Sequence, residues 1–139
     1  MRPQFVTTRR VEFVDTDLAG IMHFSNYYRY MEQAEHEYFR SLGLDIHQVN
    51  EDGSIVGWPR VKASCTFEAP ARCNDLLELR LHIERKGVKS LTIVVEFWKD
   101  EQRLAHGKLK TVCCRFRHGE PMQSIEIPPP YSDLIAEAS

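Results

Sequence analysis

The chain has 139 residues, of which 42% are hydrophobic and 27% are charged, and these values predict one domain over residues 1–139 with a substantial core. A formal net charge of −2 argues against a nucleic-acid-binding protein that relies on a broad basic face. No apolar run approaches the length of a membrane span and the N-terminus lacks an apolar signal segment, so the expected location is cytoplasmic.

The N-terminal part of the chain predicts a strand followed by a long helix. The strand is expected from Phe5 to Val14, and the helix from Ser25 to Leu42, where Gly43 provides a C-terminal cap. Glu35 lies on the apolar stripe of this helix, where a carboxylate is costly unless it is paired. The other members of the stripe follow helical spacing and are Phe24, Tyr28, Met31, Tyr38 and Leu42.

Four further strands are predicted after a loop from Leu44 to Gly53. Apolar and polar residues alternate with period two in most of this region, and turn residues separate the runs. The expected strands cover residues 61–69, 77–83, 91–97 and 104–116. The tail from Pro128 onward is expected to be an extended surface segment with a frayed end.

This order of elements predicts an α+β fold in which one long helix packs on a five-stranded antiparallel sheet. An antiparallel sheet with one solvated face produces the observed alternation of apolar and polar residues. One helix cannot easily cover five strands of this length, and the edges of a sheet must be protected. We therefore expect a homodimer or a homotetramer.

The segment between the first strand and the helix carries the candidate chemistry. Asp15 and Asp17 precede Gly20 and the first turn of the helix. A helix N-terminus presents unpaired backbone N–H groups, so a carboxylate beside it could act as a base or nucleophile next to an oxyanion site. Asp residues before a helix also commonly cap turns. The residues alone leave both interpretations open.

The same segment, V-E-F-V-D-T-D-L-A-G-I-M-H-F-S-N-Y, resembles the signature of the 4-hydroxybenzoyl-CoA thioesterase family, whose members are acyl-CoA hydrolases of the hotdog fold. Three later segments are similar to that family as well: Pro70–Leu79, Lys86–Ser90 and Ile125–Pro128. The resemblance spans nearly the whole chain, and D-x-D-x-x-G-I is its most specific part.

The resemblance implies a thioesterase that hydrolyses a small aryl- or acyl-CoA to the free acid and CoA, with no metal and no cofactor apart from the CoA of the substrate. Asp17 occupies the position of the catalytic carboxylate, as nucleophile or as general base on water. The backbone N–H of Phe24 would polarise the thioester carbonyl, and Gly20 would let the loop approach the substrate closely.

Other residues are candidates with more than one interpretation. His23 could act as a general acid or bond the substrate, or it could be satisfied by local backbone. Glu35 could orient a catalytic water or hold the Asp17 loop, or it could form a buried structural pair with an Arg or a Tyr hydroxyl. The expected substrate-binding residues are Gly20, Ile21, Tyr27, Lys86, Lys89 and Ser90. Arg85, Lys86 and Lys89 of the hairpin would meet the phosphates of CoA, or they are ordinary solvated charges.

Two functions of other classes remain open. One is a non-catalytic acyl-binding module with the same fold, and the other is a hotdog dehydratase or hydratase, for which only His23 with Glu35 could supply the His–carboxylate pair. A metal site is not expected, because the six histidines form no H-E-x-x-H motif. The four cysteines form no C-x-x-C motif, so free thiols are expected.

Overall fold

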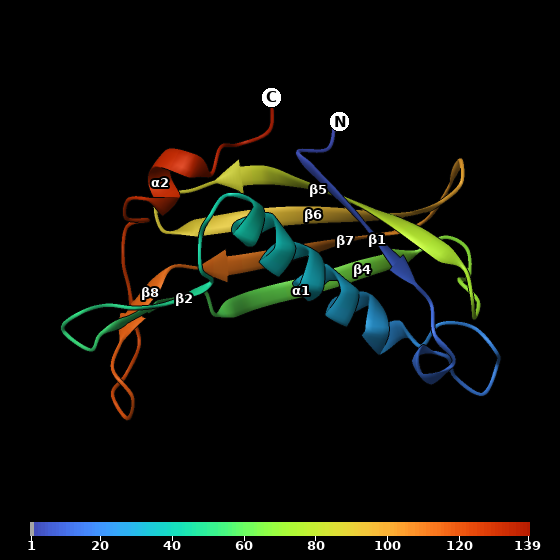
Figure 1. Ribbon diagram of the computed structural model, residues 1–139, viewed down its shortest axis with the longest axis horizontal. Coiled ribbons are helices and arrows are strands. Elements are labelled where there is room, and N and C mark those ends of the chain that lie inside the picture. Colours follow the sequence, from blue (N-terminus) through green and yellow to red (C-terminus); the bar gives the residue numbers. More distant parts are fainter. Residues whose placement is uncertain (1) are drawn as a thin grey trace.

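The computed structural model describes residues 2–139, in which one long helix, α1 (Phe24–Ser41), lies across a five-stranded antiparallel main sheet (Figure 1). The strands, in the order in which they pair, are β1 (Phe5–Arg10), β5 (Leu76–Lys86), β6 (Ser90–Lys99), β7 (Gln102–Val112) and β4 (Arg60–Phe67). The predicted α+β fold, with one helix on a five-stranded antiparallel sheet, is confirmed.

The core lies between α1 and the inner face of the main sheet. Alternate residues of the two central strands are completely buried there, namely Leu77, Leu79, Leu81 and Ile83 in β5 and Leu91, Ile93, Val95 and Phe97 in β6. The residues between them point to the outer face, which is turned away from α1, because successive side chains of a strand alternate. The period-two pattern of the sequence therefore identified the buried face of these strands correctly.

The buried face of α1 differs from the predicted stripe at its N-terminal end. Phe24 is 59% exposed, because the first turn of the helix borders a surface cavity instead of the core. The residues that α1 buries are Tyr27, Tyr30, Met31, Ala34, Glu35, Tyr38 and Phe39. The stripe is thus rotated toward Tyr27 and Tyr30 in its first turns.

The first strand is shorter than predicted. β1 ends at Arg10, and Phe13–Asp15 form a short 3-10 helix, η1. The backbone N–H of Glu12 donates to Oδ2 of Asp15 at 3.0 Å, which closes a capping box around this turn. The turn redirects the chain toward the loop that carries Asp17.

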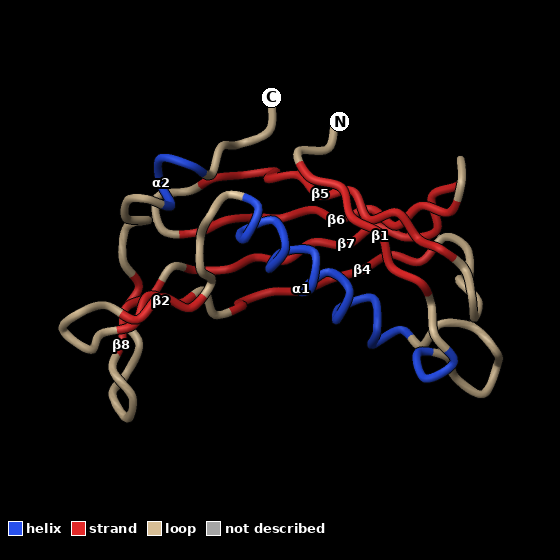
Figure 2. The backbone as a smooth tube through the Cα atoms, viewed as in Figure 1, coloured by secondary structure: helices blue, strands red, loops and turns tan. Residues whose placement is uncertain are grey.

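A second, small sheet lies at the opposite end of the molecule from the start of α1 (Figure 1). Its strands are β2 (His47–Val49), β3 (Ile55–Gly57), β8 (Cys114–Phe116) and β9 (Gln123–Ser124). The predicted loop 44–53 therefore contains a strand, and the predicted strand 104–116 divides at Cys113 between the two sheets. Loops gather at both ends of the main sheet (Figure 2).

The C-terminal tail is not the frayed surface segment that the sequence predicted. It forms a short helix, α2 (Tyr131–Leu134), and it buries Tyr131 and Ile135 almost completely. The Tyr131 ring lies 5.4 Å from that of Trp58 and 6.2 Å from that of Phe39, measured between centroids. These apolar side chains close the end of the core near the C-terminus of α1, which the proline-rich start of the tail did not indicate.

Two further features of residues 2–139 bear on function. All four cysteines are free. No helix in this part of the chain has the length and apolar character needed to cross a membrane.

Candidate active site

Asp17 lies in a tight turn between η1 and α1. Its backbone carbonyl accepts the N–H of Gly20 at 3.0 Å, and its Oδ1 accepts the N–H of Ala19 at 2.8 Å. Gly20 has φ near +80°, a left-handed conformation that glycine adopts without strain. These contacts hold the carboxylate while its Oδ2 receives no hydrogen bond from residues 2–139.

The residues that follow this turn are hydrogen-bonded to the segment that precedes β5. Ile21 pairs with Arg72 in an antiparallel bridge, and the N–H of Met22 donates to the carbonyl of Ala71 at 2.7 Å. Two segments that are distant in the sequence, and that each resemble the thioesterase family, are therefore side by side in space. Together they form the rim of one cavity.

The first turn of α1 supplies a free backbone donor next to Asp17. Nδ1 of His23 accepts the N–H of Ser25 at 3.2 Å and so caps the helix. The N–H of Phe24 has no acceptor within residues 2–139. The positive end of the helix dipole lies at the same place and also favours negative charge there.

The cavity beside Asp17 has a volume of about 480 Å³ and a mainly apolar wall. It is lined by Asp17, Ile21, Met22, Phe24, Tyr27, Phe67, Glu68, Ala69 and Pro70. The rings of Tyr27 and Phe67 meet edge to face with their centroids 4.9 Å apart. Burial raises the pKa of the Tyr27 hydroxyl, so it is a neutral group at neutral pH. This arrangement suits an apolar acyl group whose carbonyl lies between a carboxylate and a helix N-terminus.

The structure brings together four of the predicted site residues, since Asp17, Ile21, Phe24 and Tyr27 all line this cavity, with Gly20 in the adjoining turn. The sequence did not indicate Phe67 or the stretch Glu68–Pro70, because their place beside the loop depends on long-range pairing. The only signal was the resemblance of the segment from Pro70 onward.

His23 faces a different cavity on the other side of the loop. That space, of about 460 Å³, is bordered by polar residues that include Asp15, Asn26 and Tyr30. His23 therefore contributes to helix capping in this structure, and its Nδ1 is occupied by Ser25.

Glu35 also lies away from Asp17. It is eleven residues beyond Phe24, which corresponds to about 16 Å along the helix axis. Its Oε1 accepts from Nη2 of Arg60 at 3.0 Å. Burial raises the pKa of the Glu35 carboxyl to about 7, the Arg60 charge opposes that shift and Glu32 adds to it. Within one chain His23 and Glu35 are consequently not neighbours, although a dehydratase site would need them together.

The hairpin residues lie at the far end of β5 from Asp17 in the same chain. The Asp17 loop adjoins Arg72, just before β5, whereas Lys86 is the last residue of β5, so about 33 Å of strand separates the two ends. The Lys86 ammonium donates to the carbonyl of Ser132 at 2.6 Å. Lys89 is exposed and Ser90 is half-buried beside it.

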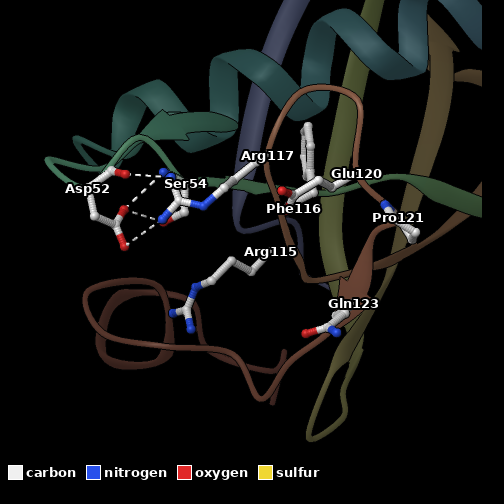
Figure 3. Close-up of a pocket in the computed structure, with 8 residues that line it drawn as sticks. All are labelled: Asp52, Ser54, Arg115, Phe116, Arg117, Glu120, Pro121 and Gln123. Carbon is white, nitrogen blue, oxygen red and sulfur yellow. Dashed lines mark hydrogen bonds and ion pairs between the residues drawn. The ribbon is translucent and has the colours of Figure 1, made fainter.

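A separate cavity of about 310 Å³ lies on the small sheet, and three of the polar residues that line it are paired with one another (Figure 3). Oδ1 of Asp52 accepts from the N–H and the hydroxyl of Ser54, and Oδ2 lies 3.5 Å from Nη2 of Arg117 (Figure 3). Arg115 stands apart from this network. Carboxylates line this cavity, but no long helix begins there, so it does not combine a carboxylate with a helix N-terminus as the Asp17 cavity does. Within residues 2–139, no group of three or more His, Cys, Asp and Glu side chains is placed to hold a metal ion.

Comparison with known proteins identifies the group to which the chain is related. Residues 19–106 match the sequence profile of the thioesterase superfamily. The chain is 30% identical over 136 residues to the 4-hydroxybenzoyl-CoA thioesterase of a Pseudomonas species, with 92% of this chain and 94% of that protein covered. It is 26% identical over 131 residues to the 1,4-dihydroxy-2-naphthoyl-CoA hydrolase of Thermosynechococcus vestitus, with 94% and 87% covered.

Solved structures give the same result. A mutant 4-hydroxybenzoyl-CoA thioesterase in complex with 4-hydroxybenzoyl-CoA aligns with a TM-score of 0.84 at 26% identity, over 95% of this chain and 98% of that chain. A gentisyl-coenzyme A thioesterase aligns with a TM-score of 0.79 at 30% identity, over 94% and 98%. The fold is therefore the hotdog fold, and the protein is a thioester hydrolase. The chain belongs to the thioesterase superfamily, as its resemblance to 4-hydroxybenzoyl-CoA thioesterases implied.

Proposed function

We propose that this chain hydrolyses a small aryl- or acyl-CoA thioester to the free acid and CoA. The observation that carries the proposal is a mainly apolar cavity lined by both Asp17 and Phe24, whose Oδ2 and N–H, respectively, have no partner within residues 2–139. The names of three similar proteins specify hydroxylated aryl-CoA thioesters, which supports an aryl substrate. The proposed reaction takes place in the cytoplasm, where the four free cysteines stay reduced.

The chemistry requires an attacking group and a place for negative charge. As a general base, Asp17 accepts a proton from water, and the water oxygen attacks the thioester carbonyl. As a nucleophile, Asp17 attacks the carbonyl itself and forms an anhydride that water then hydrolyses. In both routes the N–H of Phe24 stabilises the oxyanion, the C–S bond breaks and the CoA thiolate takes up a proton. Neither route needs a metal or a cofactor beyond the CoA of the substrate.

The functional unit is proposed to be a homodimer, or a homotetramer built from such dimers. β4 is an edge strand of the main sheet, and its apolar residues Val61 and Phe67 are 58% and 48% exposed. An exposed edge of this length offers unpaired backbone groups to a second copy of the strand. Pairing of β4 with β4 across a two-fold axis would cover both the edge and these side chains.

Such a pairing would build each active site from two chains. The two copies of β4 would run antiparallel, so the end of one that carries Arg60 would meet the end of the other that carries Phe67. The cavity of one copy that holds Glu35 and Arg60 would then adjoin the Asp17 cavity of the second copy. This polar wall would face the distal end of the acyl group, where a hydroxyl of an aryl substrate could bond.

The same pairing gives the hairpin residues a place in the site. Ser90 pairs with Val112 and Arg60 pairs with Thr111, so the hairpin lies at the Arg60 end of the main sheet. Lys89, with Lys86 and Ser90 beside it, would approach the second copy's substrate and contact its CoA phosphates.

The test is turnover of a panel of acyl-CoA thioesters, followed with a thiol reagent, for wild type and Asp17→Asn. Asn keeps the size and the turn hydrogen bond of Asp17 but can act neither as base nor as nucleophile. We expect kcat to fall by about 10²–10⁴-fold, the usual size of an acid–base contribution, with KM and the melting temperature little changed.

Asp15→Asn is the matched control and should lower kcat less. If Asp15→Asn abolished turnover while Asp17→Asn stayed within a few-fold of wild type, the roles of the two carboxylates would be reversed. A wild-type protein that binds acyl-CoA thioesters without turnover would be a binding module. Hydration of an enoyl-CoA in place of thiol release would indicate a hydratase.

A further inference from the structure

The outer face of the main sheet carries a row of basic residues in direct cross-strand register. Arg85 of β5 pairs with Thr92 of β6, Thr92 pairs with Lys110 of β7, and Lys110 pairs with Lys62 of β4. Residues that are directly opposite in an antiparallel sheet point to the same face. The row lies on the outer face, because Leu91 and Ile93, on either side of Thr92, are buried in the core.

The three cations of this basic row have no carboxylate partner within residues 2–139. The salt bridges of the described chain include none that involves Arg85, Lys110 or Lys62, and all three side chains are exposed. The nearest carboxylate along β5, Glu84, is already paired with Lys108 at 2.9 Å.

Three cations elsewhere on the same face, Arg103, Arg80 and Lys108, are paired with carboxylates, whereas Arg10 donates to the carbonyl of Asn74. Arg103 bonds both Glu68 and Glu96 at 2.8 Å, and Arg80 bonds Glu78 at 2.6 Å while lying over the Trp98 ring. Ion pairs are therefore present on this face, but the three cations of the basic row take part in none of them.

The unmatched cations are an unfavourable arrangement for the chain alone. Like charges that are directly opposite on paired strands repel, and Lys62 and Lys110 have this relation. The row spans about 14 Å, because neighbouring strands are about 4.8 Å apart. Thr92 lies between Arg85 and Lys110, and Lys62 is one strand further on. This row of donors matches an anion with several oxygen acceptors, for which a phosphate or diphosphate is the simplest example.

We propose that Lys62, Lys110 and Thr92, extended by Arg85, form a phosphoanion-binding site on the outer face of the main sheet. The anion is either the nucleotide phosphate group of the CoA substrate, which rests on the proposed function, or free phosphate or diphosphate. The row lies at the same end of the sheet as Lys89, so a nucleotide held by the hairpin would have its remaining phosphates within reach of the outer face.

The first test is calorimetric titration of the intact protein with inorganic pyrophosphate at low ionic strength, for wild type and for the double variant K62Q/K110Q. We expect the double variant to lose at least tenfold in affinity. The matched control is R40Q/R117Q, which removes the same charge at the end of α1 and on the small sheet, and it should bind as wild type does. Thermal melting checks that both variants are folded. The site would be refuted if wild type did not bind pyrophosphate, or if both double variants bound it equally.

The second test separates the two sources of the anion. If K62Q/K110Q raises KM several-fold for an acyl-CoA but not for the matching acyl-pantetheine, which lacks the nucleotide, the anion is the CoA phosphate. If pyrophosphate binding is lost while both KM values are unchanged, the site takes free phosphate. Because calorimetry needs no turnover, a protein that binds pyrophosphate in the predicted way but hydrolyses no thioester would contradict the proposed function alone.

Discussion

Asp15 and Asp17 are two residues apart and chemically identical, yet their hydrogen bonds differ. Oδ2 of Asp15 accepts from the Tyr30 hydroxyl at 2.7 Å and from the N–H of Glu12, and its carbonyl accepts from Asn26 at 2.8 Å. Asp15 therefore anchors the loop to α1, whereas the Asp17 carboxylate accepts only the N–H of Ala19 within residues 2–139 and lines the apolar cavity. The sequence placed both carboxylates before a helix but could not separate them, because the Tyr30 contact joins residues fifteen apart.

The buried carboxyl of Glu35 should make stability depend on pH. Its pKa is raised from 4.5 to about 7 by burial, against the Arg60 charge, so the folded state binds a proton that the unfolded state has lost between these two pH values. The contribution of Glu35 to the free energy of unfolding is therefore complete below about pH 4.5 and is lost as pH rises toward 7. We expect wild type to lose up to about 3 kcal/mol more than Glu35→Gln between pH 5 and pH 8, at about 1.36 kcal/mol per pKa unit.

Chemical denaturation of both proteins across this pH range measures the difference. Other titrating groups near the carboxyl, Glu32 and His36, are present in both proteins and largely cancel. Burial lowers the pKa of His36, which favours its neutral form. Parallel pH profiles for the two proteins would show that Glu35 stays ionised in the folded state. The sequence did anticipate a buried pair with an Arg as one interpretation of Glu35, but Arg60 follows 25 residues later and could not be named.

Among the elements, the contact between α1 and β7 depends on a glycine. A Cβ on Gly107 would lie 2.4 Å from Sδ of Met31 and 2.8 Å from the backbone carbonyl of Ser64. The thioether can move, but the carbonyl belongs to the paired strand β4. We expect Gly107→Ala to destabilise the protein by about 1–3 kcal/mol through overpacking, which lowers the melting temperature by about 4–12 °C.

Differential scanning calorimetry of Gly107→Ala, Met31→Ala and the double variant tests this origin. If Gly107→Ala acts by crowding Met31, the double variant should lose less stability than the two single variants lose in sum. A melting temperature of Gly107→Ala within one degree of wild type would mean that the strands separate easily at this point.

The elements that the sequence predicted well are those whose pattern is local. The alternation in β5 and β6 and the periodicity of α1 follow from the burial of one face, which each segment records in its own residues. β2, β3 and β9 have at most three residues each, too few to show a period. The tail was predicted wrongly because its prolines dominate the local signal, whereas Tyr131 and Ile135 are buried by contacts with distant residues such as Phe39 and Trp58.

At the scale of the whole molecule, the proposed shared site rests on where the strand order places its parts. The Asp17 cavity and the hairpin with Lys89 lie at opposite ends of the main sheet, and the β4 edge between them is exposed. The sequence indicated oligomers through the ratio of one helix to five strands, and it indicated the hairpin through resemblance. The sequence could not place the Asp17 cavity and the hairpin at opposite ends of the sheet, because that placement depends on strand order.

We therefore expect the 16.2 kDa chain to be at least dimeric at micromolar concentration, as measured by light scattering, and to be active only in that form. Ala63 is exposed in the middle of β4, so Ala63→Glu places a charge in the proposed interface and should shift the protein toward monomer and lower kcat together. Val6→Glu, a change of the same kind on β1 at the opposite edge, should leave both unchanged, because Val6 is 45% exposed away from β4. A stable wild-type monomer with full activity would contradict the proposal of a shared site. Loss of assembly in Val6→Glu alone would indicate that the interface is formed by the β1 edge.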